Sequence, residues 1–397
     1  MKIAFLLGSL AVGGGNYVVV QHALHAKTTG HDVTLVVQSR FSSAQAAWHP
    51  GLSQLRLVHL GDCENECYDI AVATFWKTVL HLHRLNAGQY AYFIQSIESR
   101  FFDASQAEWR RLVDSTYDLR LPAITEATWI KEHLQRVHGS ACLLARNGIR
   151  KDLYTQAGER HAARQPGKLR VMVEGGFGVS FKNTARTLRL MRRAKPHQSW
   201  LLTSTELSWY PGVDRVFSRV PITAVAPIYR SCDVLVKLSL VEGMFGPPLE
   251  MFHCGGTAIV YDVSGHDEYI VHGGNALVAP MHDEATVLEH LRRLRDSPQL
   301  LAELKQGAAE TAAQWPDWPE SSAQFLEHLA TWYAAPRVSR EWLKDATHRL
   351  RDDFELILRS SAPAQRGSGR RSGLLRVVKE GIRPYTNLLR YIAEGYR

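Results

Sequence analysis

Two carboxylates flank a tight turn in the second half of the chain. Glu242 follows an apolar run that predicts a strand, and Glu250 lies in the first turn of a predicted helix, after Pro247 and Pro248. Carboxylates accept hydrogen bonds from sugar and ribose hydroxyls, whereas a helix start, here at Phe245 and Gly246, supplies N–H groups and a positive dipole end for phosphate. The spacing alone is a weak signal, because a Glu in a first helical turn often only complements the helix dipole.

Two glycine-rich loops each follow a predicted strand and open a predicted helix. The first contains Gly13, Gly14 and Gly15, and the second runs from Glu174 through Gly176 to Lys182 and Asn183. Glycine lets a ligand approach the backbone, and Lys182 would bring a cation to it rather than serve as a solvated surface lysine. A dinucleotide site is disfavoured at the first loop, because the third glycine of that fingerprint and the ribose-binding acid after the second strand are both missing.

A polar and aromatic segment follows another predicted strand near residue 94. Gln95 and Glu98 could accept hydroxyl hydrogens of a sugar, and Phe101 and Phe102 could stack on it. A strand end that packs its aromatic side chains in the core explains the segment equally well.

Short apolar runs alternate with helical stretches along most of the chain, and this predicts an α/β protein with two doubly wound, Rossmann-like halves facing a cleft. The predicted strands are 3–7, 33–37, 55–58, 70–73, 92–94, 119–124, 169–173, 200–203, 233–237, 257–261 and 276–278. The predicted helices are 16–27, 77–85, 104–114, 126–137, 182–194, 225–231, 247–254, 284–295, 299–314, one opened by the stretch 315–322 and running to 332, and 337–359. We expect one Rossmann-like domain at 1–150, a second at 151–335, a helical extension at 336–361, and a linker with a basic tail at 362–397.

The segment Val-Glu-Gly-Met-Phe-Gly-Pro-Pro-Leu-Glu around Glu242 and Glu250 resembles the signature of family-four glycosyltransferases, a retaining group with the GT-B fold. The glycine loop at 13–15, the stretch 261–278 and Asn147-Gly148 fit the same resemblance, which spans residues 1 to about 332. The helix after Trp315 resembles the final helix that crosses back to the first domain in such enzymes. The segment 92–102 resembles a subgroup that acts on rhamnose-containing and related bacterial polysaccharides.

The resemblance implies transfer of a sugar from a nucleotide-sugar donor to a glycan or lipid-linked acceptor, with retained configuration, in cell-surface polysaccharide synthesis. It assigns the acceptor to the domain at 1–150, the nucleotide-sugar donor to the domain at 151–335, and catalysis to Glu242 and Lys182. Donor contacts fall to Gly14, Gly15, Gly176, Phe245, Gly246 and Glu250, and acceptor contacts to Gln95 and Glu98. The family implies no metal and no other cofactor. Phe177 stands near the position where the family has an arginine on the donor diphosphate, so Lys182 and the helix start at Gly246 would carry more of that charge.

Two other functions stay open. A nucleotide-sugar epimerase of the same fold would lack the paired glutamates, and a non-catalytic sugar-nucleotide or partner-binding protein would explain the missing arginine. Activity without an acceptor would reveal the first, and loss of transfer in Glu242→Ala and Lys182→Ala would exclude the second.

Charge is concentrated at the C-terminus. Eight Arg and Lys between 366 and 397 oppose Glu380 and Glu394, so this tail holds +6 of the net +8 and the rest is nearly neutral. A nearly neutral body argues against nucleic-acid binding. Apolar residues recur at helical spacing among the cations of 374–397, which predicts peripheral contact with an anionic membrane, although docking on the protein's own surface is the other reading. Five scattered cysteines and no long apolar run indicate a cytoplasmic protein, peripheral at most on the membrane.

Overall fold

The chain folds into two compact units. The computed structural model describes residues 1–63, 65–361, 387–388 and 390–395. The first unit contains Met1–Arg150 and Trp315–Ser361, and the second contains Lys151–Gln314 together with the described residues after 386. We predicted a second domain that ends at 335, whereas Trp315–Ser361 belongs to the first unit, as the resemblance to a returning final helix implied.

Within the described residues, the first unit is built on a seven-stranded parallel sheet of order β3-β2-β1-β4-β5-β6-β7. Its strands are β1 (Lys2–Leu7), β2 (Asp32–Val37), β3 (Arg56–His59), β4 (Cys67–Ala73), β5 (Asn86–Ile94), β6 (Ala123–Thr125) and β7 (Cys142–Leu144). Its helices are α1 (Gly14–Thr28), α2 (Trp76–Val79), α3 (Ala107–Tyr117), α4 (Thr128–His133), α10 (Trp318–Ala334) and α11 (Arg340–Ser361).

Helices cover both faces of this sheet because its central strands are apolar on both sides. In β1, Phe5 joins a core that includes α1 and α10, whereas Leu6 joins the core beneath α2, α3 and α11. α10 is fixed on the first face by Phe325, which is fully buried, and by the Trp332 indole N–H, which donates to the Ala123 carbonyl at 3.0 Å. The close approach before α10 explains one glycine: a Cβ on Gly148 would collide with the Asp317 backbone.

Among the described residues, the second unit has a six-stranded parallel sheet of order β10-β9-β8-β11-β12-β13. Its strands are β8 (Arg170–Glu174), β9 (Gln198–Thr203), β10 (Arg215–Ser218), β11 (Val234–Lys237), β12 (Thr257–Tyr261) and β13 (Leu277–Ala279). Its helices are α5 (Thr184–Ala194), α6 (Val225–Ser231), α7 (Gly246–His253), α8 (Glu284–Asp296) and α9 (Pro298–Gln314). The predicted class, two Rossmann-like α/β units, is therefore confirmed.

Strand order reverses beside the first strand of each unit. β1 pairs with both β2 and β4, and β8 pairs with both β9 and β11. Ligands of open parallel sheets bind at the carboxyl ends of the strands at such a point. The loops after β8 and β11 are therefore the first place to look for a site in the second unit.

Two strands, β7 and β10, were not predicted from the sequence. Each is short and lies at the edge of its sheet, with several side chains partly or fully exposed. An edge strand lacks the continuous apolar run that identifies the buried strands of a parallel sheet.

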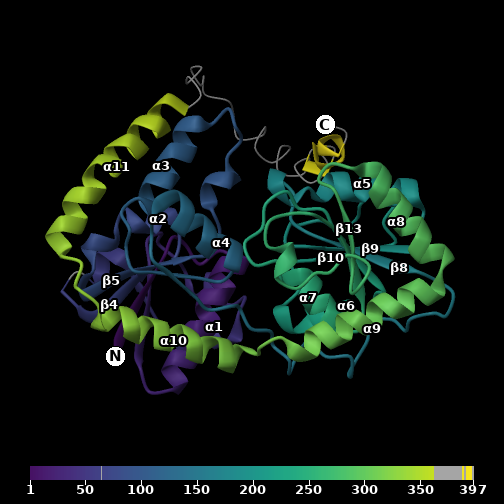
Figure 1. Cartoon of the computed structure of the whole chain (residues 1–397), viewed down its shortest axis with the longest axis horizontal. Helices are drawn as coiled ribbons and strands as arrows, with labels where there is room; N and C mark the ends of the chain where they lie inside the picture. The colour runs from purple at the N-terminus through teal and green to yellow at the C-terminus, as the bar shows by residue number, and fades with distance from the viewer. Residues whose placement is uncertain (64, 362–386, 389, 396–397) are drawn as a thin grey trace, which may run out of the picture. The chain divides into compact units, whose positions relative to one another are not determined.

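The described part of the C-terminal tail packs on the second unit. Leu388, Tyr391 and Ile392 contact the core that includes α5 and α8, and Gly395 approaches the Ala185 carbonyl of α5 so closely that a Cβ would lie 2.8 Å from it (Figure 1, yellow helix beside α5). Most of the predicted linker and basic tail, 362–386, 389 and 396–397, lies outside the described residues. No helix among the described residues is both long and apolar enough to cross a bilayer.

Candidate functional site

The glycine loop after β8 is tied to the loop after β11. Gly175 is required where the chain leaves β8, because a Cβ there would collide with the Thr184 hydroxyl. A short 3-10 helix, Ser180–Lys182, then leads into α5. The Asn183 amide donates to the Leu238 carbonyl at 2.9 Å, and the Leu240 N–H donates to the Phe181 carbonyl at 2.7 Å. These two bonds hold Lys182 next to the segment that carries Glu242.

Lys182 and Glu242 form an ion pair at this edge of the sheet. The Lys182 Nζ lies 2.9 Å from each carboxylate oxygen of Glu242. The Lys182 side chain is 29% exposed and that of Glu242 only 8%. Burial acts to raise the pKa of Glu242, but Lys182 and then Lys237 outweigh it and hold that pKa below its usual range. Glu242 is therefore a buried, ionised acceptor with one solvent-accessible cation beside it.

Glu250 occupies a different environment, one turn into α7. Burial raises the pKa of Glu250 to about 7, and nearby Glu174 adds to the shift. Hydrogen bonds from Tyr154 and Tyr229, both buried, oppose the shift and orient the carboxyl group. Glu250 therefore changes protonation near neutral pH, while Glu242 stays ionised.

The start of α7 supplies fewer N–H donors than we predicted. The Gly246 N–H donates to the Met244 carbonyl at 2.9 Å, and Pro247 and Pro248 have no N–H. Phe245 is fully buried, and its carbonyl accepts a hydrogen bond from the Tyr269 hydroxyl. The Gly246 N–H is therefore already used by a local carbonyl, and the two prolines offer none, so side chains must supply much of the positive charge at this helix start.

A second ion pair, which the sequence did not reveal, lies in the interior beside the first. Lys237, the last residue of β11, is 2% exposed, and its Nζ binds both the carboxylate and, at 3.3 Å, the carbonyl oxygen of Glu174 at the end of β8. Burial acts to lower the pKa of Lys237, but Glu174, Glu242 and Glu250 outweigh it and raise that pKa. The only sequence signal was a lysine at the end of the otherwise apolar run Val234–Val236.

The second glycine loop also contains the residue that departs from the family pattern. Phe177 stacks on Tyr210 and on Tyr391 of the C-terminal helix, with ring centroids 5.4 and 4.7 Å apart. Its N–H donates to the Thr205 hydroxyl at 2.8 Å. At Gly176, a Cβ would lie 3.0 Å from the Ser204 hydroxyl oxygen, so a side chain there would crowd the loop.

The first unit brings its predicted site residues together only in part. The Gln95 side chain lies against Gly15, where a Cβ would come 3.3 Å from its amide group, and donates to the Thr74 carbonyl at 3.2 Å. Gly14 is open, with nothing within 4 Å of a Cβ. The first glycine loop and Gln95 therefore meet at the carboxyl ends of β1, β4 and β5.

Glu98 does not join them at the surface. It is 2% exposed and accepts hydrogen bonds from the Trp76 N–H at 2.7 Å and the Tyr92 hydroxyl at 3.2 Å. Burial raises the pKa of Glu98 to about 8. Phe102 likewise packs inward, stacked on Trp109. Glu98 is thus buried and Phe102, which is partly buried, packs against the same core, in agreement with the alternative that this strand end packs its side chains inward.

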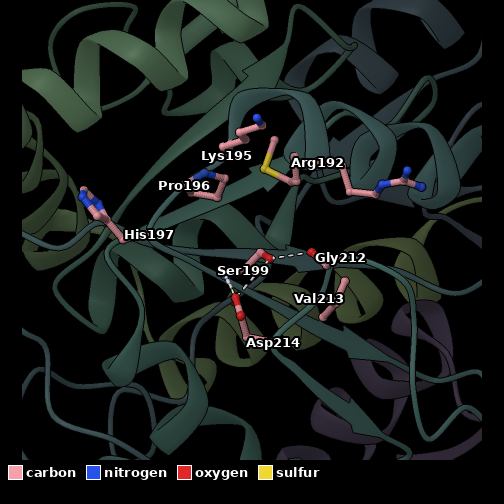
Figure 2. Close-up of a pocket in the computed structure, with 9 residues that line it drawn as sticks. Arg192, Lys195, Pro196, His197, Ser199, Gly212, Val213 and Asp214 are labelled. Carbon is pink, nitrogen blue, oxygen red and sulfur yellow. Dashed lines mark hydrogen bonds between the residues drawn. The ribbon is translucent and has the colours of Figure 1, made fainter.

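A cavity of about 390 Å³ lies elsewhere in the second unit (Figure 2). It is lined by Arg192, Lys195, Ser199 and Asp214 among others, at the amino ends of β9 and β10. It is therefore at the opposite edge of the sheet from Lys182 and Glu242. Among the described residues, no cluster of three or more His, Cys, Asp or Glu side chains suits a metal ion.

Comparison with known proteins gives the same picture. Residues 215–311 match the family model "Glycosyl transferases group 1", a range that contains Lys237, Glu242 and Glu250. The chain is 28% identical over 290 residues to the O-antigen biosynthesis protein RfbC of Myxococcus xanthus. The matched region covers 68% of this chain but 21% of RfbC. The chain thus spans about a fifth of the length of this curated relative.

Solved structures share the fold at low sequence identity. Sucrose-phosphate synthase from Thermosynechococcus elongatus has a TM-score of 0.66 at 15% identity, covering 85% of this chain and all of its own. Anabaena HepE in complex with UDP-glucose has a TM-score of 0.65 at 15% identity and covers 83% of this chain and all of its own. WaaG, a glycosyltransferase involved in lipopolysaccharide biosynthesis, has a TM-score of 0.60 at 13% identity, covering 82% of this chain and 99% of its own.

Proposed function

Because this chain carries a glycosyltransferase group 1 domain on a GT-B-type fold, we propose that it transfers a sugar from a nucleotide-sugar donor to a glycan or lipid-linked acceptor. The observation that carries the proposal is the arrangement of Lys182, Glu242 and Glu250 after β8 and β11, where a parallel sheet binds its ligands. A cation beside two carboxylates in different protonation states suits a ligand with both phosphates and hydroxyls.

Each of these side chains has a distinct role in the proposed reaction. Glu242 accepts hydrogen bonds from hydroxyls of the donor sugar, and Glu250 accepts them from the ribose. Lys182 binds the diphosphate, together with the glycine loop at Gly176. Because the bond to the departing diphosphate breaks as negative charge grows on it, a cation already in place stabilises the transition state most.

We further propose that configuration at the sugar carbon is retained, through substitution on the face from which the diphosphate leaves. No covalent nucleophile stands out in the sequence, and the resemblance to a retaining family supports this course. NMR assignment of the newly formed glycosidic linkage tests it, since an inverted anomeric carbon would rule out retention.

The acceptor belongs, in our proposal, to cell-surface polysaccharide synthesis. The names of the similar proteins RfbC and WaaG refer to O-antigen and lipopolysaccharide biosynthesis, and these names support the proposal. In the first unit, Gln95 and the loop at Gly14 and Gly15 are the residues that would contact the acceptor or donor from that side. Glu98 is buried and supports this segment from within.

Release of nucleoside diphosphate and transfer to acceptor glycans, measured over a panel of nucleotide sugars, test the proposed function. The wild-type chain should release diphosphate from one donor faster in the presence of acceptor, and Lys182→Met and Glu242→Gln should lose this activity while remaining folded. Turnover without any acceptor, with the sugar epimerised, would identify the epimerase alternative. Nucleotide binding without turnover would identify the non-catalytic one.

A metal is not required in the proposed mechanism, since the partly exposed Lys182 supplies a cation for the departing diphosphate. Full activity after dialysis against EDTA is expected. Activity that is lost with EDTA and restored only by a divalent cation would contradict this part of the proposal.

Peripheral contact with the cytoplasmic face of an anionic membrane remains our proposal for the basic remainder of 374–397. Leu388 and Ile392, two of the apolar residues counted toward that contact, pack on the second unit instead. Flotation with anionic vesicles, comparing the full chain with one that ends at Ser361, tests the proposal. Equal partitioning of the two would refute it.

A further inference from the structure

The ion pair between Lys182 and Glu242 raises a question about the donor site. In the structure, the Lys182 ammonium group lies 2.9 Å from both carboxylate oxygens of Glu242. A donor diphosphate needs the same cation. If Lys182 turns toward it, Glu242, which is 7% exposed in the structure, loses its nearest counter-charge. A buried carboxylate without a cation tends to take up a proton and would then no longer accept freely from sugar hydroxyls.

Lys237 lies where it can prevent this. It is the terminal residue of a central strand, five positions before Glu242, and it is 2% exposed whereas the Lys182 side chain is 29% exposed. Its two bonds to Glu174 fix the ammonium group on the neighbouring strand β8. Of the two lysines, Lys182 is therefore the one able to move, and Lys237 is the fixed charge.

On the basis of the proposed function, we propose that Lys237 is a positioning residue of the donor site: its buried ammonium group preserves the negative charge of Glu242 when Lys182 turns to the donor diphosphate. Glu174 anchors Lys237 and compensates part of its charge.

The electrostatics of the surrounding groups support this assignment. The charged groups that act on Glu242 are Lys182 from the 3-10 helix and Lys237 from β11. Tyr269, which follows a short 3-10 helix at 266–268, is also buried nearby. Burial raises the pKa of Tyr269, Glu242 and Glu250 raise it further, and a backbone hydrogen bond only partly opposes them. Tyr269 therefore stays neutral. Lys237 in turn has Glu174, Glu242 and Glu250 as its counter-charges, so it stays cationic. When Lys182 leaves, Lys237 is the remaining cation that acts on Glu242 among these groups.

The test compares Lys237→Met, Lys237→Arg and the matched control Lys305→Met by the pH dependence of kcat/KM and kcat. The Lys305 Nζ lies 2.6 Å from a carboxylate oxygen of Asp233, the residue that precedes β11, and the Lys305 side chain is 22% exposed. Removing Lys305 therefore measures the effect of losing a paired lysine away from the donor site. In Lys237→Met, the acid limb of the pH profile of kcat/KM should move up by about one pH unit or more. Below that limb, kcat/KM should then be roughly tenfold lower than in the wild type, and Lys237→Arg should restore most of the lost activity. An acid limb unchanged in folded Lys237→Met would overturn the inference.

A second readout does not depend on turnover. Carbon NMR of carboxyl-labelled glutamate, with Glu242 assigned through Glu242→Gln, follows its titration with and without a bound nucleoside diphosphate. The inference predicts that the Glu242 titration midpoint rises in Lys237→Met, and more so in the nucleotide complex. A Glu242 midpoint that is the same in Lys237→Met as in the wild type refutes the role of Lys237. If the midpoint does rise in Lys237→Met but the wild-type chain transfers no sugar, the proposed function alone is refuted.

Discussion

Replacing Lys182 by Met separates a structural ion pair from a donor-binding one. Two unit charges 2.9 Å apart attract by about 6 kcal/mol at an effective dielectric constant near 20, and desolvation offsets much of this. Because the Lys182 side chain is 29% exposed and Lys237 still acts on Glu242, we expect Lys182→Met to lower the free energy of unfolding by only about 1–3 kcal/mol.

The effect on the donor should be larger and specific. Loss of a charge-assisted hydrogen bond to phosphate removes about 1.5–3 kcal/mol of binding, which is a tenfold to hundredfold increase in Kd, and turnover should fall by about 10²–10³-fold. Denaturant unfolding gives the first quantity, and calorimetric titration with nucleoside diphosphates gives the second.

Lys305→Met is the matched control for this comparison. The Lys305–Asp233 pair has side-chain exposures of 22% and 8%, close to the 29% and 8% of Lys182–Glu242, and it lies at the opposite end of β11. It should cost similar stability and leave nucleotide affinity unchanged. Equal nucleotide affinity in Lys182→Met and Lys305→Met would refute the assignment of Lys182 to the diphosphate.

Three further predictions follow from individual contacts. Because burial raises the pKa of Glu250 to about 7 and ribose hydroxyls need its ionised form, nucleotide affinity should rise between pH 6 and 8, and Glu250→Gln should abolish that slope; a slope preserved in the variant contradicts this. Burial raises the pKa of Glu98 to about 8, so between about pH 4.5 and 8 the native state keeps a proton that the unfolded chain releases. The free energy of unfolding of the wild type, relative to that of Glu98→Gln, should therefore fall over this range by up to about 1.4 kcal/mol per pH unit, as measured by thermal unfolding. Tyr391→Ala should remove the stacking on Phe177 and lower stability by about 1 kcal/mol in denaturant titrations, whereas an unchanged midpoint would mean that this helix is not docked in solution.

The fold could be predicted from the sequence because buried parallel strands have a local signature. Runs such as Val33–Val37 and Thr257–Tyr261 are apolar apart from one threonine each and alternate with helices, so the sequence pattern identifies them. The edge strands β7 and β10 lack this pattern, and only pairing with a neighbour makes them strands.

The site could be predicted only where the chemistry is local in the sequence. Glu242 and Glu250 share one turn, and Lys182 follows a glycine loop, so their types and spacing were informative. The pairing of Lys237 with Glu174 depends on β8 and β11 being neighbours, which no local pattern states. The Gly246 N–H donates to a local carbonyl because of the backbone conformation of the turn, which the residue types do not state. Glu98 turns inward because of how the surrounding core packs, which likewise has no local signal.

The central claim is that a nucleotide sugar binds at the carboxyl ends of β8 and β11. A crystal structure of the chain with a bound nucleoside diphosphate tests this most directly. We predict phosphate oxygens within hydrogen-bonding distance of Lys182 Nζ, a ribose on Glu250, and Lys182 displaced from Glu242 while Lys237 stays on Glu174. A nucleotide bound instead in the cavity beside Arg192 and Lys195, or Lys182 unmoved from Glu242 with the diphosphate elsewhere, would contradict the claim.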